Sequence, residues 1–287
     1  MPDVRGRLSP SAPEVLAPPA AHAPWVGMAA VALVLMALGA WLRLDGHDSA
    51  VFRALNGPLG AAAPLAWSLG SVAGLGLGAV ILGLALCAGH RPRTLRAVAA
   101  LAWSLPVGGA LTHGLKALFD TPRPAGVLAP DQIVVVGQPL LFHSMPSGHS
   151  ITAGVCLALA LLAAAPLGLR LAVAAFAGWV WLSRIAAGAH WPSDVLVGAG
   201  IGLLAGWISW SLAGRGGFAA WLGGRGGQTL LGGVQLATGV AMVFTATGYP
   251  LAVPLQWALA LLGVAAGTHR LWRLWRPFRG QPGGAAA

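Results

Sequence analysis

Three short motifs in this chain supply the side chains that phosphate chemistry needs. In order, they are Lys116-x6-Arg123-Pro124, Pro146-Ser147-Gly148-His149 and Ser183-Arg184-x5-His190-x3-Asp194. Together they contribute three cations, two imidazoles and one carboxylate. These groups can hold a phosphate, attack its phosphorus atom and protonate the group that leaves.

The first motif places two cations near one helix end. Lys116, the only lysine in the chain, closes a long apolar run, and Arg123 follows after a short stretch that contains Pro122. Both side chains should therefore emerge on the same side and can meet one anion. The alternative is that Lys116 only snorkels to the membrane interface, as lysines at helix ends do. Asp120 is expected to pair with Arg123 when no substrate is bound.

The second motif directly precedes another apolar run, so Ser147 is predicted to cap a helix. Gly148 leaves the backbone N–H groups of the first turn accessible, and free N–H groups at a helix start bind phosphate oxygens. His149 then lies on the first turn, where an imidazolium can donate a proton to a departing oxygen. An ordinary helix cap without any ligand is the alternative interpretation.

The third motif combines an arginine fork with a histidine and an acid. Arg184 closes an apolar run and can bind two phosphate oxygens at once. His190 and Asp194 are four residues apart, which places them on one face of a helix. A carboxylate on one ring nitrogen fixes the tautomer and leaves the other nitrogen free to attack. A purely structural hydrogen bond between the two residues is the alternative.

The composition requires a membrane protein. Hydrophobic residues make up 57% of the chain and charged residues only 8%, with a mean hydropathy of +0.75. The net charge of +10 is better explained by arginines that anchor helix ends at the cytoplasmic face than by nucleic-acid binding. Cys87 and Cys156 lie inside apolar runs, which indicates packing rather than a disulfide or a metal site.

Eight stretches are apolar and long enough to cross a bilayer, which needs roughly 20 residues. They cover residues 25–43, 68–89, 95–118, 149–167, 170–188, 194–213, 228–247 and 252–268. The sequence therefore predicts an all-α fold, a polytopic membrane bundle with a six-span core and two extra C-terminal spans.

The distribution of positive charge predicts the orientation. If the loops alternate between the two sides, one side receives twelve lysines and arginines and the other side five. The positive-inside rule then places both termini in the cytoplasm and all three motifs outside. The five outward cations include Lys116, Arg123 and Arg184, which depart from the rule, and phosphate binding explains the departure.

Three regions follow from this assignment. Residues 1–24 are predicted to be a disordered cytoplasmic tail, 25–213 the six-span core, and 214–287 a two-span extension with a basic tail that anchors at the interface. The turn at 248–250 carries no ionisable group expected to act in catalysis. Residues 48–67 are either a helix lying in the membrane interface or a simple connector.

The order of the three motifs on one predicted face resembles the signature of the type 2 phosphatidic acid phosphatase and vanadium haloperoxidase superfamily. The resemblance covers the six-span core. It implies that His190 is the nucleophile that forms a phosphohistidine, that Asp194 orients it and that His149 is the general acid. It also assigns phosphate binding to Lys116, Arg123, Ser147, Gly148 and Arg184. Neither a metal nor a cofactor is expected, because three cations neutralise the phosphate charge.

The resemblance implies a phosphatase for a lipid phosphate or diphosphate in a bacterial inner membrane, with the site facing the periplasm or exterior. Undecaprenyl diphosphate, phosphatidylglycerophosphate, phosphatidate and lipid A phosphate all fit, and the outward orientation favours the first. One alternative is a phosphotransferase that passes the phosphate to a second lipid. A membrane transporter is another, although the span centres carry almost no charge. The expected partners are the lipid substrate and the bilayer; nucleic acid is not expected, and the oligomeric state is left open.

Overall fold

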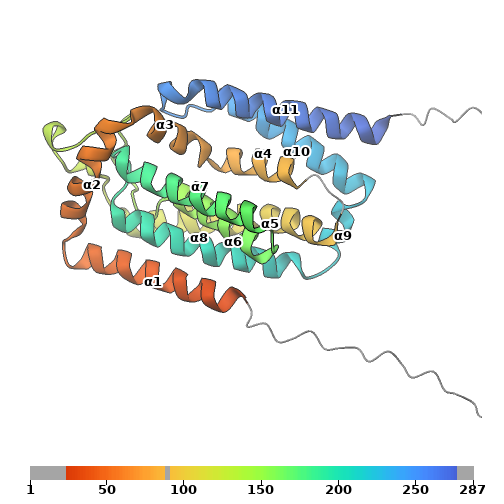
Figure 1. Cartoon of the computed structure of the whole chain (residues 1–287), viewed down its shortest axis with the longest axis horizontal. Coiled ribbons are helices and arrows are strands. Elements are labelled where there is room, and N and C mark those ends of the chain that lie inside the picture. Colours follow the sequence, from red (N-terminus) through yellow and green to blue (C-terminus); the bar gives the residue numbers. More distant parts are fainter. Residues whose placement is uncertain (1–23, 88–90, 277–287) are drawn as a thin grey trace, which may run out of the picture.

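The computed structural model describes residues 24–87 and 91–276, and within these ranges every regular element is a helix (Figure 1). The α-helices are α1 (Pro24–Leu44), α2 (Asp48–Ala62), α3 (Pro64–Ala73), α4 (Gly76–Leu86), α5 (Pro92–Phe119), α6 (Gly148–Leu162), α7 (Leu167–Ala186), α8 (Pro192–Ala213), α9 (Phe218–Leu222), α10 (Arg225–Phe244) and α11 (Val253–Trp275). Three short 3-10 turns lie at Pro124–Gly126, Pro130–Gln132 and Pro250–Ala252. The predicted all-α fold is confirmed. The predicted tail at 1–24 falls, except for Pro24, outside the described residues.

Six of the described helices are long and apolar enough to cross a membrane: α1, α5, α7, α8, α10 and α11. The bent pair α3 and α4 makes a seventh span if it is counted as one. The remaining predicted span corresponds to α6, which has only 15 residues and so rises about 22 Å. That length falls short of a hydrocarbon core of about 30 Å.

The span predicted at 68–89 is wrong as a single helix. It breaks between α3 and α4, and the two halves are bent by 70°. The cause lies in the alternating glycines from Gly74 to Gly78, since glycine lowers helix stability and removes the side chains that would pack across a turn. The bend keeps α3 at the end of the bundle where the three motifs lie.

Two other boundaries differ from the prediction. The helix expected at 149–167 stops at Leu162, because Ala164 adopts a left-handed conformation and Pro166 begins the next turn. The last span is longer than the predicted 252–268 and runs to Trp275. Arg270, expected in an interfacial tail, instead belongs to α11 and donates a hydrogen bond to the Leu84 carbonyl at 3.0 Å.

Helix α8 is the most buried of the long helices and contacts α1, α5 and α6. Close contact with α6 depends on glycine: a Cβ atom at Gly198 would lie 2.7 Å from the Ser147 carbonyl oxygen, and one at Gly154 would lie 2.8 Å from the Ala199 carbonyl oxygen. The first turns of α6 and α8 therefore lie against each other. This contact brings the second and third motifs together.

Helix α2 runs across the end of the bundle, roughly perpendicular to the long helices (Figure 1). Its buried residues are Asp48, Phe52, Asn56 and Gly60, spaced four apart on one face. The Asn56 amide donates to the carbonyls of Val134, Ile185 and Ala186, and its oxygen accepts from the Val134 N–H. Because these contacts hold the last turn of α7, α2 is more than a connector.

The predicted extension begins after α8 and contains α9 to α11. Helices α10 and α11 form an antiparallel pair that packs against α4 and α3 (Figure 1). The two helices approach closely at Gly239 and Gly263, where a Cβ atom on either glycine would lie under 3.0 Å from the backbone of the other helix. The pair ends in a turn at 248–250, on the same side of the molecule as the motifs.

Candidate active site

The candidate site lies where four helix ends meet. The C-terminal ends of α5 and α7 carry the first motif and Arg184, and the starts of α6 and α8 carry the remaining motif residues. Direct contacts join them: the Ser147 N–H donates to the Asp194 carbonyl at 3.1 Å, and the Arg123 guanidinium lies 3.1 Å from His190 Nε2. The structure thus brings the three motifs to one end of the bundle.

His190 sits in a tight turn between α7 and α8 and is 2% exposed. The N–H groups of Ala189 and His190 both donate to the Arg184 carbonyl, at 3.0 and 3.1 Å. Gly188 makes the turn possible, since its φ is +72° and a Cβ atom there would lie 2.6 Å from the Val134 carbonyl oxygen. The turn fixes the His190 backbone directly after the arginine of the same motif.

The contacts of the imidazole define its tautomer. His190 Nδ1 lies 3.4 Å from Asp194 Oδ2, while Nε2 faces Arg123. An arginine has only donors, so Nε2 must accept and carry a lone pair, and the ring proton resides on Nδ1. This arrangement makes Nε2 the nitrogen that can attack.

The pKa of His190 is held well below its ordinary value. Burial is the largest cause, followed by the positive charges of Arg123, Arg184 and Lys116 and by the neighbouring His149. The ring is therefore neutral near pH 7. The charges of cations from the first and third motifs, together with His149 of the second, therefore act on one imidazole.

Asp194 is fully buried and concentrates its contacts on one oxygen. Oδ2 accepts hydrogen bonds from the Ser144 hydroxyl and, at 2.9 Å, from the Trp191 N–H, and it also faces His190 Nδ1. Trp191 is the N-cap of α8, so the carboxylate also stabilises the start of that helix. Oδ1 has no partner. The carboxylate is thus held in place by groups other than the histidine that it orients.

Arg184 is a buried cation at 1% exposure. One terminal nitrogen donates to the Ser71 hydroxyl, and the guanidinium lies over the Tyr249 ring at 5.6 Å from its centroid. Its Nε is buried without a hydrogen-bond partner, and among the described residues no carboxylate pairs with it. A buried charge without a counter-ion is energetically unfavourable. A bound anion beside Arg184 would therefore be stabilised.

Lys116 and Arg123 are covered by backbone carbonyls. The Lys116 amine donates to the carbonyls of His143 and Ser144. The Arg123 guanidinium donates to the carbonyls of Phe142 at 2.8 Å and Ala189 at 2.9 Å. The expected pair of Asp120 with Arg123 is wrong. Asp120 takes a left-handed conformation at the end of α5, and its carboxylate lies 3.1 Å from His143 Nδ1 instead.

Ser147 is confirmed as the N-cap of α6. Its hydroxyl accepts from the Ser150 hydroxyl at 2.9 Å and, at a longer 3.4 Å, from the Ser150 N–H. Gly148 starts the helix, and the His149 side chain lies near the backbone of Ser71 on α3. The phosphate contacts of Ser147 and Gly148 remain predictions. The structure places the second motif beside the α3–α4 bend.

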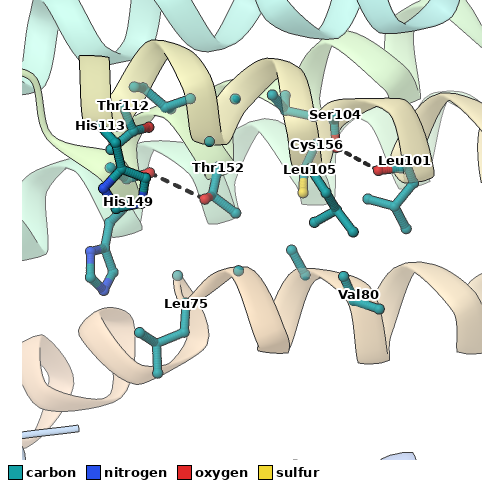
Figure 2. Close-up of a pocket in the computed structure, with 18 residues that line it drawn as sticks. Leu75, Val80, Leu101, Ser104, Leu105, Thr112, His113, His149, Thr152 and Cys156 are labelled. Carbon is teal, nitrogen blue, oxygen red and sulfur yellow. Dashed lines mark hydrogen bonds between the residues drawn. The ribbon is translucent and has the colours of Figure 1, made fainter. Parts of the chain in front are cut away.

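A cavity of about 480 Å³ opens beside His149 (Figure 2). The α3–α4 bend lines one side and helices α5 and α6 line the other, with Leu75, Thr112 and Thr152 among the lining residues. A second cavity of about 480 Å³ continues between α4, α5, α6 and α7 with an almost wholly apolar lining. The two share Ala79, Leu101 and Cys156. Two neighbouring cavities with mainly apolar walls therefore lie beside the site.

Several residues at the site could not be found from the motifs. Ser71 contacts Arg184, Ser144 contacts Asp194, and Tyr249 covers Arg184. Ser144 stands two residues before the second motif and has no spacing of its own to mark it. Ser71 and Tyr249 lie far from the motifs in sequence, so only the tertiary packing reveals them.

Comparisons with known proteins agree with this geometry. The sequence profile of the PAP2 superfamily matches residues 97–217, a range that contains all three motifs. The crystal structure of LpxE from Aquifex aeolicus is similar with a TM-score of 0.50 and 28% identity, covering 57% of this chain and 94% of that chain.

A lipid A 1-phosphatase from Rhizobium etli is 45% identical over 69 residues, which make up 24% of this chain and 27% of that protein. The matched segment thus spans only about a quarter of that relative. The profile match contains every motif and the structural match covers nearly all of the solved chain, so residues 97–217 of this chain carry the PAP2 superfamily pattern.

Proposed function

We propose that this protein is an integral membrane lipid phosphatase that hydrolyses a lipid phosphate or diphosphate through a phosphohistidine on His190. The observation that carries the proposal is the environment of His190. Its Nε2 lies 3.1 Å from the Arg123 guanidinium, and the charges of Arg184 and Lys116 also act on the ring; Arg184 is buried without an anionic partner among the described residues. A phosphate group would supply the missing negative charge and lie in front of the nucleophile.

The first step forms a bond from His190 Nε2 to phosphorus and breaks the bond from phosphorus to the lipid oxygen. The electron pair leaves with that oxygen, which takes a proton from His149; the negative charge of the bound phosphate offsets the nearby cations and favours the protonated His149 ring. As the ring becomes cationic, the Asp194 carboxylate at Nδ1 stabilises it. With a diphosphate, the leaving group is the lipid monophosphate.

In the second step a water molecule attacks the phosphohistidine. The new bond joins the water oxygen to phosphorus, the bond to Nε2 breaks, and the water proton passes to His149. Inorganic phosphate leaves, and both histidines regain their starting states. Lys116, Arg123 and Arg184 neutralise the phosphate oxygens throughout, which supports a mechanism without a divalent metal.

The apolar cavities support a lipid as the substrate. The cavity beside His149 is lined mostly by small and apolar residues and shares lining residues with the apolar cavity between α4 and α7. A hydrocarbon tail can occupy these cavities while its head group remains among the cations. The exposed side chains of Leu140 and Phe142 rim the loop over the site and suit the membrane interface.

Two substrates stand out. The likeness to the lipid A 1-phosphatase supports a sugar-linked lipid phosphate, whereas the predicted orientation favours undecaprenyl diphosphate. Both require the site at the outer face of a bacterial inner membrane with the termini in the cytoplasm, as the arginine distribution indicates. We propose undecaprenyl diphosphate as the first substrate to assay and lipid A 1-phosphate as the second.

The test is phosphate release by the detergent-purified full chain, with EDTA present, from these two lipids, phosphatidate and phosphatidylglycerophosphate. We expect turnover of at least one lipid and none with the His190→Ala variant. Absence of release from every lipid, or a strict need for divalent metal, would contradict the proposal. Transfer of labelled phosphate to an added lipid in preference to water would identify a phosphotransferase instead.

A further inference from the structure

Tyr249 lies outside the region that matches the PAP2 profile, yet it reaches the candidate site. It is the only tyrosine in the chain, and it occupies the turn between α10 and α11. No motif in the sequence assigns this turn to the site. In the structure Tyr249 is 7% exposed, and its ring lies under the Arg184 guanidinium.

The contacts of Tyr249 converge on the arginine that lacks an anion. The Arg184 carbon between the terminal nitrogens lies 5.6 Å from the ring centroid, within range of a cation–π interaction. The tyrosine hydroxyl lies near Ser71 and Arg184, and Arg184 donates a hydrogen bond to the Ser71 hydroxyl. Tyr249 and Ser71 thus hold two sides of the guanidinium and leave its buried Nε without a partner.

The surrounding chain is built to admit this ring. The Gln138 N–H donates to the Gly248 carbonyl at 2.9 Å, which joins the turn to the loop before the second motif. A Cβ atom at Gly137 would lie 2.8 Å from Tyr249 Cδ1, so only glycine leaves room. Gln256 on α11 donates to the carbonyls of Met242 and Thr245 at 2.8 Å and fixes the end of α10.

Burial by itself would raise the pKa of Tyr249. The charge of Arg184, the polar contacts with Ser71 and Arg184, and the charge of Arg123 together outweigh burial and lower it. The phenol therefore lies close to Arg184 and Arg123, two of the cations proposed to bind the phosphate.

We propose that the C-terminal pair α10 and α11 completes the phosphate site, with Tyr249 as a positioning residue that aims the Arg184 guanidinium at the bound phosphate. The proposal rests on the phosphatase function proposed above. It gives the two spans beyond the profile match a role in binding the anion. Removing the tyrosine should leave Arg184 buried but free to rotate away from the phosphate.

The first experiment compares Tyr249→Phe and Tyr249→Leu with Trp257→Leu, a control on an exposed face of α11. The first variant keeps the ring and loses the hydroxyl, and the second loses both. We expect kcat/KM to fall roughly tenfold in the first and roughly a hundredfold in the second, because contacts to charged groups are lost. The inhibition constant for inorganic phosphate should weaken in the same order, and the control should match the wild type.

A general packing defect would lower the melting temperature, but it would not weaken kcat/KM and phosphate inhibition in the same order across the variants. The proposal is overturned if folded Tyr249→Leu keeps the wild-type kcat/KM and phosphate inhibition. It is also overturned if Trp257→Leu shows the same losses. If Tyr249→Leu does not fold, the proposal is tested by comparing Tyr249→Phe with the wild type and by the fluorine NMR titration described next.

The second experiment needs no turnover. Because the chain has one tyrosine, 3-fluorotyrosine gives a single fluorine NMR signal from position 249 in the full chain. We expect orthovanadate or inorganic phosphate to shift this signal with saturation, and the Arg184→Ala variant to lose the shift. An unshifted signal in a protein that hydrolyses lipid phosphates would refute the positioning role alone. A saturable shift without any lipid turnover would leave it standing and refute the proposed function.

Discussion

Replacing Asp194 with asparagine tests the electrostatic part of the mechanism. The change keeps the shape of the side chain and an oxygen that can still accept from Ser144 and the Trp191 N–H, but it removes the negative charge. The carboxylate oxygen lies 3.4 Å from His190 Nδ1, with side-chain exposures of 0% and 2%. The charge therefore acts on the ring at short range and away from bulk water.

The size of the effect follows from Coulomb's law. Two unit charges 3.4 Å apart attract by about 5 kcal/mol at an effective dielectric constant of about 20. The attraction appears only when the imidazole becomes cationic, so its loss raises the barrier to phosphorylation. Each 1.4 kcal/mol changes a rate about tenfold, and the hydrogen bond that asparagine retains offsets part of the loss. We expect kcat to fall about 10³-fold.

The assay is single-turnover release of phosphate from the best lipid substrate. Asp131→Asn is the matched control, because Asp131 is exposed on the loop over the same end of the bundle. Its rate should equal that of the wild type. If Asp194→Asn keeps a rate within about tenfold of the wild type while folded, the carboxylate does not stabilise a cationic ring, and the reasoning is wrong.

Three further predictions follow from the structure. Asn56→Ala removes four hydrogen bonds and should lower the free energy of unfolding in detergent by about 2 to 4 kcal/mol; an unchanged thermal midpoint would contradict this. His190 attacks as the neutral ring and its pKa is lowered, so kcat/KM for an aryl phosphate, corrected for substrate ionisation, should stay level on acidification through about pH 6.5 and fall only below it. An acid limb centred at that value would argue against the burial of a neutral nucleophile. In Gly74→Ala the new Cβ atom would lie 2.6 Å from Val180 Cγ1 and 3.3 Å from His149 Cδ2, so lipid turnover should drop roughly tenfold while aryl phosphate, which needs no acid, is spared; equal losses on both substrates would count against it.

The sequence predicted the gathering of the motif residues because each motif lies at the end of an apolar helix. Lys116 ends α5, Ser147 caps α6 and Asp194 lies in the first turn of α8. Helix ends on one side of a membrane bundle lie at a similar depth. The apolar periodicity and the alternation of loops were therefore sufficient to predict that the motif residues lie together. The profile and structural matches support the family that these motifs indicated.

Other features depend on packing that no local pattern records. The apolar run at 68–89 gave no sign of its 70° bend, although glycines mark the place. Ser71 and Tyr249 reach Arg184 only because that bend and the α10–α11 turn lie at the same end of the bundle. Asp120 was expected to pair with the nearest cation in sequence, but the left-handed end of α5 directs it to His143.

The central claim is that phosphorus passes through His190, and rapid quenching with phosphorus-32-labelled lipid phosphate tests it most directly. The account predicts a labelled protein intermediate that is lost in acid, forms no more slowly than phosphate is released, maps to His190 by mass spectrometry and is missing from His190→Ala. Label on any other residue, or steady turnover by His190→Ala, would contradict it.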